Sequence, residues 1–182
     1  MTETQPIAFL DRDGTLVNCG VSDGVPVPAH DAVEFADGAA EACEHLRKLG
    51  FALAMVTNQP DVSRGTVDRR TVEQANECIA ETLGLDVVLA CMHDDLDQCV
   101  CRKPRPGLLF EAASILDLSL DRSSVIIGDR WRDIDAGAAA GVTTVLLDRG
   151  YGELLNNQPD HTARDLIGAV DWIGAHLVRS QQ

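Results

Sequence analysis

Two carboxylates, Asp11 and Asp13, lie two residues apart beside Gly14, directly after the apolar run at 7–10. On a turn opened by a glycine, both side chains can face the same ligand. One carboxylate can then attack an electrophile while the other transfers a proton. Together they also suit a hard cation such as Mg²⁺, which prefers oxygen ligands. The alternative for this segment alone is a solvated turn that uses Asp and Gly for backbone reasons.

A hydroxyl and two amides follow the second apolar run, at 51–56. They belong to Thr57, Asn58 and Gln59. Together with exposed backbone N–H groups at a strand end, such groups can hold phosphate oxygens. Taken alone, the segment could equally be a loop start with helix-capping character.

A third polar segment follows the apolar run at 125–127. Asp129 stands where a second metal carboxylate would be needed, and Arg130 comes next. Asp133 lies four residues beyond Asp129, and a helix starting there would bring it back to the same side. The alternative is the enrichment of acids at a helix N-terminus, which suits the helix dipole.

Basic residues are scarce in this chain, which has 182 residues, 29 acids, 15 bases and a formal net charge of −14. The acidic excess argues against nucleic acids and anionic membranes as partners, because both are polyanions. Three of the bases nevertheless fall within four residues, as Arg102, Lys103 and Arg105. Here Lys103 can supply a point charge and Arg102 a fork for phosphate. A solvated basic run is the alternative.

Three thiols and one imidazole crowd into eleven residues, at Cys91, His93, Cys99 and Cys101. This Cys3His set suits a tetrahedral structural zinc with no open position for water. The two ligand pairs are spaced more tightly than in zinc fingers, and fortuitous cysteines in a loop are the alternative. We expect zinc to stabilise this loop and to hold Arg102 and Lys103 near a phosphate.

Apolar runs alternate with amphipathic runs, which predicts an α/β fold with a Rossmann-like parallel sheet and helices on both faces. Strands are expected at 7–10, 51–56, 87–90, 125–127 and 142–147. Helices are expected at 39–49, 71–83, 106–116, 134–140 and 166–177. Ligands of such sheets bind beyond the carboxyl ends of the strands, which is where the polar segments fall.

The length fits a single domain over residues 1–182. Neither 15–56 nor 58–102 has room for a separate cap domain, so we expect a capless fold. Substrate selection then falls to the loops at 17–35 and 59–66 and to the zinc-binding loop. No segment approaches the length of a membrane span, and the first residues lack a secretory signal pattern. We therefore expect a cytoplasmic protein, and the lack of a cap is compatible with a monomer.

The polar segments DRDGTL, VTNQ, RKP and GDRWRD resemble, in order, the four motifs of the haloacid-dehalogenase-like (HAD) phosphatases. The resemblance implies a HAD-like fold and phosphoryl transfer through an aspartyl-phosphate. It implies that Asp11 is the nucleophile and that Asp13 is first the general acid and then the general base. Thr57 and Lys103 would stabilise the phosphoryl group.

The same resemblance implies a Mg²⁺ site. Its ligands would be the side chains of Asp11 and Asp129 and the backbone carbonyl of Asp13. Asp133 would lie behind these ligands and would not bind the ion directly.

The zinc ligands followed by RKP narrow the resemblance to a group that includes heptose bisphosphate phosphatases and histidinol phosphatases. TNQPDVSRG resembles the heptose pattern TNQSGIARG, with Pro60-Asp61 in place of Ser-Gly, and CRKPRPGLL resembles CRKPHPGML. The short zinc-binding loop is closer to the histidinol type. The resemblance favours a sugar phosphate as substrate, with a heptose 1,7-bisphosphate first and histidinol phosphate as the alternative. The expected substrate contacts are Asn58, Gln59, Arg64, Arg102 and Arg130.

Two other classes of function fit less well. Nucleic-acid 3′-phosphatases share the first motif, but the acidic chain has no extended basic stripe. A zinc-organised binding module with a decayed active site would be expected to lose a reacting group, whereas all of them are present: Asp11, Asp13, Thr57, Lys103 and Asp129.

Overall fold

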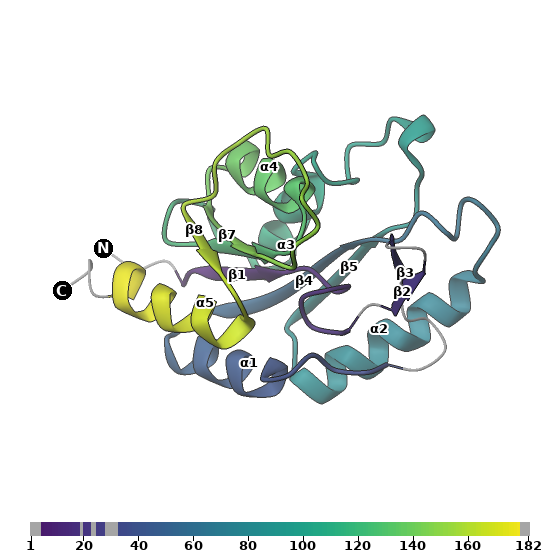
Figure 1. Cartoon of the computed structure of the whole chain (residues 1–182). Helices are drawn as coiled ribbons and strands as arrows, with labels where there is room; N and C mark the ends of the chain where they lie inside the picture. The colour runs from purple at the N-terminus through teal and green to yellow at the C-terminus, as the bar shows by residue number, and fades with distance from the viewer. Residues whose placement is uncertain (1–4, 19, 23–24, 28–32, 179–182) are drawn as a thin grey trace.

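A parallel sheet of six strands, in the order β5-β4-β1-β6-β7-β8, forms the centre of the protein (Figure 1). The structure is a computed structural model, and it describes residues 5–18, 20–22, 25–27 and 33–178. The strands are β1 (Ile7–Leu10), β4 (Ala52–Asn58), β5 (Val87–Cys91), β6 (Val125–Gly128), β7 (Thr143–Leu147) and β8 (His161–Ala163). Each neighbouring pair runs parallel, which confirms the predicted sheet type.

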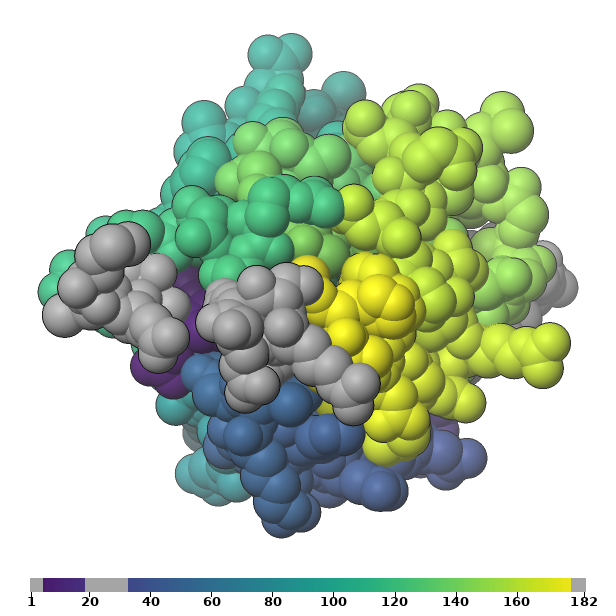
Figure 2. All heavy atoms as spheres, turned by 90° about the vertical axis from the view of Figure 1, so that its left-hand side faces the viewer, coloured from purple at the N-terminus to yellow at the C-terminus, as the bar shows by residue number. Residues whose placement is uncertain are grey.

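Helices cover both faces of the sheet because the strands are apolar on both sides. Ala8 and Leu10 point into a core shared with α1 (Ala39–Lys48), α2 (Arg69–Leu83) and α5 (Leu166–Ile173). Ile7 and Phe9 point into the opposite core, beneath α3 (Gly107–Leu116) and α4 (Trp131–Ala140). Figure 2 views the molecule from the side where β1 begins and shows α5, in yellow, against α1, in blue. No helix in the described residues is long and apolar enough to cross a membrane.

The order of the strands places a crevice at the carboxyl end of β1. From β1 the chain continues to β4 and β5 on one side and then crosses to β6 on the other. Leu10 is therefore flanked by Met55 of β4 and Ile127 of β6. The next residue, Asp11, donates its backbone N–H to the carbonyl of Ile127 at 3.0 Å. Ligands of open α/β sheets bind at such a switch point.

Two strand pairings were not expected from the sequence. The interval 17–35, expected to be an irregular loop, contains an antiparallel hairpin of β2 (Gly20–Ser22) and β3 (Val25–Val27). Residues 19, 23–24 and 28–32 of that interval lie outside the described residues. At the other edge, β8 pairs with β7 through only three residues.

All five helices differ from the predicted boundaries, and two of them differ the most. The helix expected at 134–140 begins earlier, at Trp131, immediately after the third polar segment. The helix expected at 166–177 ends at Ile173, where a π-helical turn over Gly174–Val178 replaces it. The described residues of 15–56 hold only the hairpin, α1 and the start of β4, in line with the capless prediction.

Candidate active site

A pocket of about 380 Å³ opens at the carboxyl end of β1. It is lined by groups from every polar segment that the sequence singled out: Asp11, Asp13, Thr57, Asn58, Pro60, Asp61, Arg64, Asp95, Arg102, Lys103, Asp129, Arg130, Arg132 and Asp133. We call Asp11, Asp13, Thr57, Lys103 and Asp129 the reaction centre. All predicted reacting groups therefore share one cavity.

Lys103 lies at the floor of the pocket with only 2% of its surface exposed. Its Nζ donates to Asp11 at 2.8 Å, to Asp133 at 2.5 Å and to the carbonyl of Val56 at 2.7 Å. Burial by itself lowers the pKa of Lys103. The carboxylates of Asp11 and Asp133 have the larger opposite effect and raise this pKa above its ordinary value. The ammonium is thus held charged beside the predicted nucleophile.

Asn58 lines the pocket, but both ends of its amide are engaged by Lys103. Its Nδ2 donates to the backbone carbonyl of Lys103 at 2.9 Å, and its Oδ1 accepts from the backbone N–H at 3.0 Å. This clamp joins the end of β4 to the RKP segment. These contacts favour a role for Asn58 in orienting Lys103 and speak against the predicted contact between Asn58 and the substrate.

Asp13 is held from two sides. The buried guanidinium of Arg12 donates to both of its carboxylate oxygens, at 3.0 and 3.1 Å, and is itself anchored by Asn76 at 3.0 Å. Gln59 Nε2 donates to Asp13 at 2.6 Å and to the hydroxyl of Thr57 at 3.0 Å. Burial raises the pKa of Asp13, against the opposing effect of Arg12. A raised pKa suits a general acid.

Gln59 lies beneath the pocket and not in its lining. Only 1% of its surface is exposed, and it does not line the pocket. Its amide is directed to Asp13 and Thr57, beneath the cavity. This placement favours a role for Gln59 in positioning Asp13 and Thr57 over the predicted contact with a substrate.

Three carboxylates could hold a metal ion, because oxygen atoms of Asp11, Asp129 and Asp133 all lie within 4.8 Å of one another. The close approach of these carboxylates to the backbone depends on Gly14 (φ +78°), where a Cβ atom would lie 1.9 Å from Asp129 Oδ2. It also depends on Gly128, where a Cβ atom would lie 2.3 Å from Asp133 Cγ. Both glycines are thus required by close packing against the carboxylates.

The carboxylates of this group differ in their partners. Asp133 accepts from Lys103 Nζ and from the backbone N–H of Arg130, so both of its oxygens are occupied. Asp129 Oδ2 accepts from the hydroxyl of Tyr151 at 3.0 Å, whereas its buried Oδ1 has no hydrogen-bond partner among the described residues. Burial, reinforced by the neighbouring carboxylates, raises the pKa of Asp129 to about 8. A buried carboxylate oxygen without a donor fits a cation, with Asp133 set behind it.

Four arginines also line the pocket, and each is paired with an acid; we call the part of the pocket that they line its mouth. These rim arginines are Arg64, Arg102, Arg130 and Arg132. Arg64 binds Asp94, Arg102 and Arg132 share Asp95, and Arg130 binds Glu153. Arg130 also stacks over the ring of Tyr151, at 5.0 Å from its centroid. The predicted substrate contacts Arg64, Arg102 and Arg130 therefore all line the same pocket as the reaction centre.

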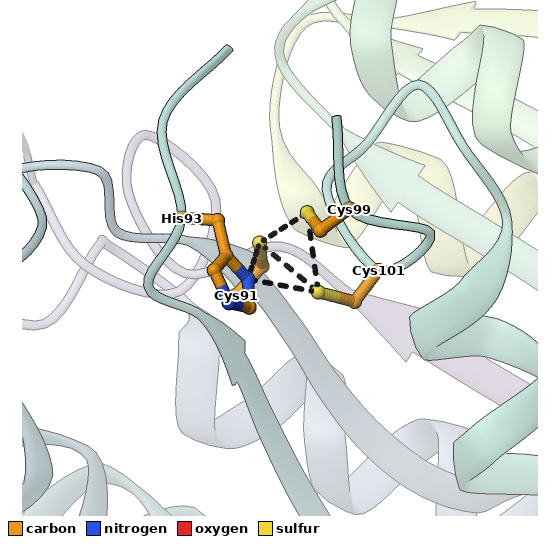
Figure 3. A group of neighbouring side chains, drawn as sticks. All are labelled: Cys91, His93, Cys99 and Cys101. Atoms are coloured by element: carbon orange, nitrogen blue, oxygen red, sulfur yellow. Dashed lines mark hydrogen bonds between the residues drawn. The ribbon is translucent and has the colours of Figure 1, made fainter. Parts of the chain in front are cut away.

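The four candidate zinc ligands converge at the end of β5 (Figure 3). The Sγ atoms of Cys91, Cys99 and Cys101 lie 3.3–3.6 Å apart, and His93 Nδ1 lies 3.3 Å from Cys101 and 3.6 Å from Cys91. Ligand atoms about 2.3 Å from a tetrahedral zinc would lie about 3.8 Å apart. The cluster is compatible with zinc after a slight expansion. We call residues 91–101 the zinc loop; it extends at the upper right of Figure 1.

Several residues at the site carried no sequence signal. Tyr151 and Glu153 contact the site from a segment that no motif marks, and Asp94 and Asp95 of the zinc loop also lie outside the motifs. Arg132 lies within the GDRWRD segment, but its contact with Asp95 joins that segment to the zinc loop and was not predicted. Only their proximity to the candidate zinc ligands could have drawn attention to Asp94 and Asp95.

Comparisons with known proteins agree with this geometry. A HAD-hydrolase-like family model matches residues 100–169. The chain is 37% identical, over 95% of its length and 92% of the relative's, to D-glycero-beta-D-manno-heptose-1,7-bisphosphate 7-phosphatase of Salmonella typhi. The chain belongs to the HAD-like phosphatase family. The HAD-like phosphatase of the same name from Escherichia coli K12 is also 37% identical, with 90% of its length covered.

Solved HAD-like structures share the fold. D,D-heptose 1,7-bisphosphate phosphatase from B. bronchiseptica, solved with magnesium and phosphate, superposes with a TM-score of 0.76 at 27% identity. That match covers 92% of this chain and 97% of the other. A HAD-like phosphatase from Mesorhizobium loti gives a TM-score of 0.74 at 29% identity, covering 97% of this chain and 87% of the other.

Proposed function

We propose that this protein is a Mg²⁺-dependent phosphomonoesterase that removes the 7-phosphate of a D-glycero-D-manno-heptose 1,7-bisphosphate. The observation that carries the proposal is the convergence of Asp11, Asp13, Thr57, Lys103 and Asp129 on one pocket at the sheet's switch point. The relatives that match most of the chain carry the name of this activity, and this supports the choice of substrate.

In the first step, a carboxylate oxygen of Asp11 attacks the phosphorus and the bond to the sugar oxygen breaks. Asp13 gives its proton to the leaving alkoxide, so the sugar departs as a neutral alcohol. Lys103 and Thr57 offset the negative charge that spreads over the phosphoryl oxygens. The hydrogen bond between Lys103 and Asp11 fixes the nucleophile for this attack.

In the second step, Asp13 takes a proton from water, and the water oxygen attacks the phosphorus of the aspartyl-phosphate. The bond between phosphorus and the Asp11 carboxylate breaks, which releases phosphate and restores both carboxyl groups to their starting states. Arg12 and Gln59 keep Asp13 facing the reacting atoms in both steps.

The residues that would hold Mg²⁺ are the side chains of Asp11 and Asp129 and the backbone carbonyl of Asp13. A bound Mg²⁺ supplies positive charge to the phosphoryl oxygens. Asp133 keeps Lys103 in place and stays behind these ligands. Zinc on Cys91, His93, Cys99 and Cys101 would be structural, since a Cys3His set leaves no open position.

We also propose that residues 1–182 form one capless phosphatase domain that works as a monomer in the cytoplasm. The location is supported by cysteines that are grouped as candidate metal ligands, which is typical of a reducing compartment. The acidic charge supports a small substrate over nucleic acid or a membrane surface.

The test is phosphate release with Mg²⁺ from both anomers of the heptose 1,7-bisphosphate, histidinol phosphate, hexose phosphates and a phosphorylated oligonucleotide. The heptose bisphosphate should give the highest kcat/KM. No release from any sugar phosphate would overturn the proposed activity. A preference for histidinol phosphate of about tenfold, or about 1.4 kcal/mol in transition-state binding, would overturn the substrate.

A further inference from the structure

Two adjacent aspartates of the zinc loop bind three of the rim arginines. Asp94 accepts from Arg64 Nε at 2.5 Å and from its Nη2 at 3.0 Å, in the two-pronged geometry of a strong ion pair. Asp95 Oδ1 accepts from Arg102 Nε at 2.8 Å and from Arg132 Nη1 at 3.4 Å. These arginines belong to three different segments of the chain, after β4, after the zinc loop and at the start of α4.

Hydrogen bonds within the zinc loop fix the position of the turn that carries these two carboxylates. Asp94 begins a 3₁₀ turn over Asp95–Asp97, and its side chain accepts from the backbone N–H of Asp95 at 2.5 Å. The carboxylate of Asp97 accepts from the backbone N–H of Asp94 at 2.6 Å. The candidate zinc ligands His93 and Cys99 flank the turn on either side. Metal binding would therefore fix both ends of the segment.

Arg102 shows how closely the loop and the pocket are joined. Only 8% of its surface is exposed, so its guanidinium needs partners within the protein. Besides Asp95, its Nη1 donates to the backbone carbonyl of His93 at 3.4 Å. One rim arginine is thus oriented both by a zinc-loop carboxylate and by the backbone of a candidate zinc ligand.

We propose that Asp94 and Asp95 are positioning residues that hold the rim arginines in place for the part of the substrate that does not react. The inference rests on the proposed function, because it needs a substrate with a second anionic group that reaches the mouth. Free arginine side chains lose much rotamer entropy when they bind an anion. Arginines that are already oriented lose less, so the carboxylates strengthen substrate binding and leave the chemical step unchanged.

The sign of the effect separates positioning from simple electrostatics. A carboxylate at the mouth repels an anionic substrate, so by charge alone its removal would lower the KM. If Asp95 acts by orienting Arg102 and Arg132, its removal instead raises the KM. The two accounts predict opposite changes for the same variant.

The experiment compares Asp95→Ala and Asp95→Asn with wild type on two substrates, a heptose 1,7-bisphosphate and phenyl phosphate. For Asp95→Ala we expect the KM of the bisphosphate to rise about tenfold, with kcat within about twofold of wild type. The KM of phenyl phosphate, which carries no second anionic group, should not change. Asp95→Asn keeps one acceptor oxygen and should recover part of the loss. Glu111→Gln removes an exposed acid of α3 and should behave as wild type.

Zinc content and melting temperature are measured for each variant, because a loop that no longer folds would also raise the KM. A folded, zinc-loaded Asp95→Ala with an unchanged or lower KM for the bisphosphate would overturn the inference. So would an equal rise for phenyl phosphate. If wild type hydrolyses phenyl phosphate but not the bisphosphate, the proposed substrate is wrong. The inference that the rim arginines bind its second anionic group is then wrong as well. An unchanged KM on a bisphosphate that wild type does hydrolyse overturns the inference alone.

Discussion

The floor and the mouth of the pocket use the same kind of interaction in different surroundings. At the floor, the Lys103 side chain is 2% exposed, and its partners Asp11 and Asp133 are 11% and 2% exposed. At the mouth, the Arg64 side chain is 45% exposed, and its partner Asp94 is 26% exposed. An ion pair is weakened by water and salt at an exposed site, whereas a buried charge that loses its partner is strongly destabilising. The ion pairs of Lys103 should therefore contribute more to stability than the ion pair between Arg64 and Asp94.

The largest effect is expected at the nucleophile. Asp11→Asn keeps the size of the side chain and a hydrogen-bond acceptor for Lys103 but removes the attacking carboxylate. We expect kcat to fall by about 10⁴-fold or more, with little change in melting temperature. Phosphate release with Mg²⁺ measures the loss. Retention of substantial activity by this variant would rule out the aspartyl-phosphate mechanism.

The next largest effect is a difference in the free energy of unfolding between a variant of the buried ion pair and a variant of the exposed ion pair. Lys103→Met leaves Asp11 and Asp133 buried without their cation, and we expect a loss of about 3–5 kcal/mol in the free energy of unfolding. Arg64→Met breaks an exposed pair and should cost less than about 1 kcal/mol. Urea denaturation followed by fluorescence measures both variants. Similar losses for the two would contradict the proposed difference between floor and mouth.

Removal of zinc should affect the mouth more than the floor. Chelation followed by dialysis into Mg²⁺ should release about one zinc per chain, lower the melting temperature and raise the KM of the bisphosphate by roughly tenfold. The kcat for phenyl phosphate should change little, because Lys103 is also clamped by Asn58. Elemental analysis and kinetics before and after zinc is restored provide the measurement. Protein made with ample zinc that contains none would refute the Cys3His site.

The smallest effect is expected in the pH profile. Burial raises the pKa of Asp13, and the hydrogen bond from Gln59 lowers it. Gln59→Leu removes that hydrogen bond, so the pKa should rise further. Because Asp13 must be protonated to assist the leaving alkoxide, kcat/KM falls as pH rises through this pKa. The descending limb should therefore move to higher pH in the variant.

The control for the pH profile is Gln74→Leu, which changes an exposed glutamine of α2. Its descending limb should coincide with that of wild type. A limb that stays in place or moves to lower pH in Gln59→Leu would show that Gln59 does not act on Asp13.

The residues at the floor of the pocket and three of the rim arginines were predictable from the sequence, whereas the acids that pair with those arginines were not. Asp11, Thr57 and Asp129 follow apolar runs, and parallel strands bring such positions to the same edge of the sheet. The rim contacts of Asp95 and Glu153 join loops that lie far apart in the sequence, and no periodicity records such contacts. Three-residue strands such as β8 were missed for a related reason, because they pair through the backbone at a sheet edge.

Gln59 shows a second limit of prediction from sequence. A motif places the residue after β4, but the side chain could turn either into the pocket or beneath it. The structure places it beneath, against Asp13 and Thr57. Only the arrangement of the surrounding side chains decides between the two orientations.

The most direct test of the account is the identity of the phosphate that is removed. The heptose 1,7-bisphosphate is incubated with the protein and Mg²⁺, and the products are followed by ³¹P NMR. If the reaction centre takes the terminal phosphate while the rim arginines hold the other end, inorganic phosphate and heptose 1-phosphate will accumulate. Accumulation of heptose 7-phosphate, or an unchanged bisphosphate, would contradict the account.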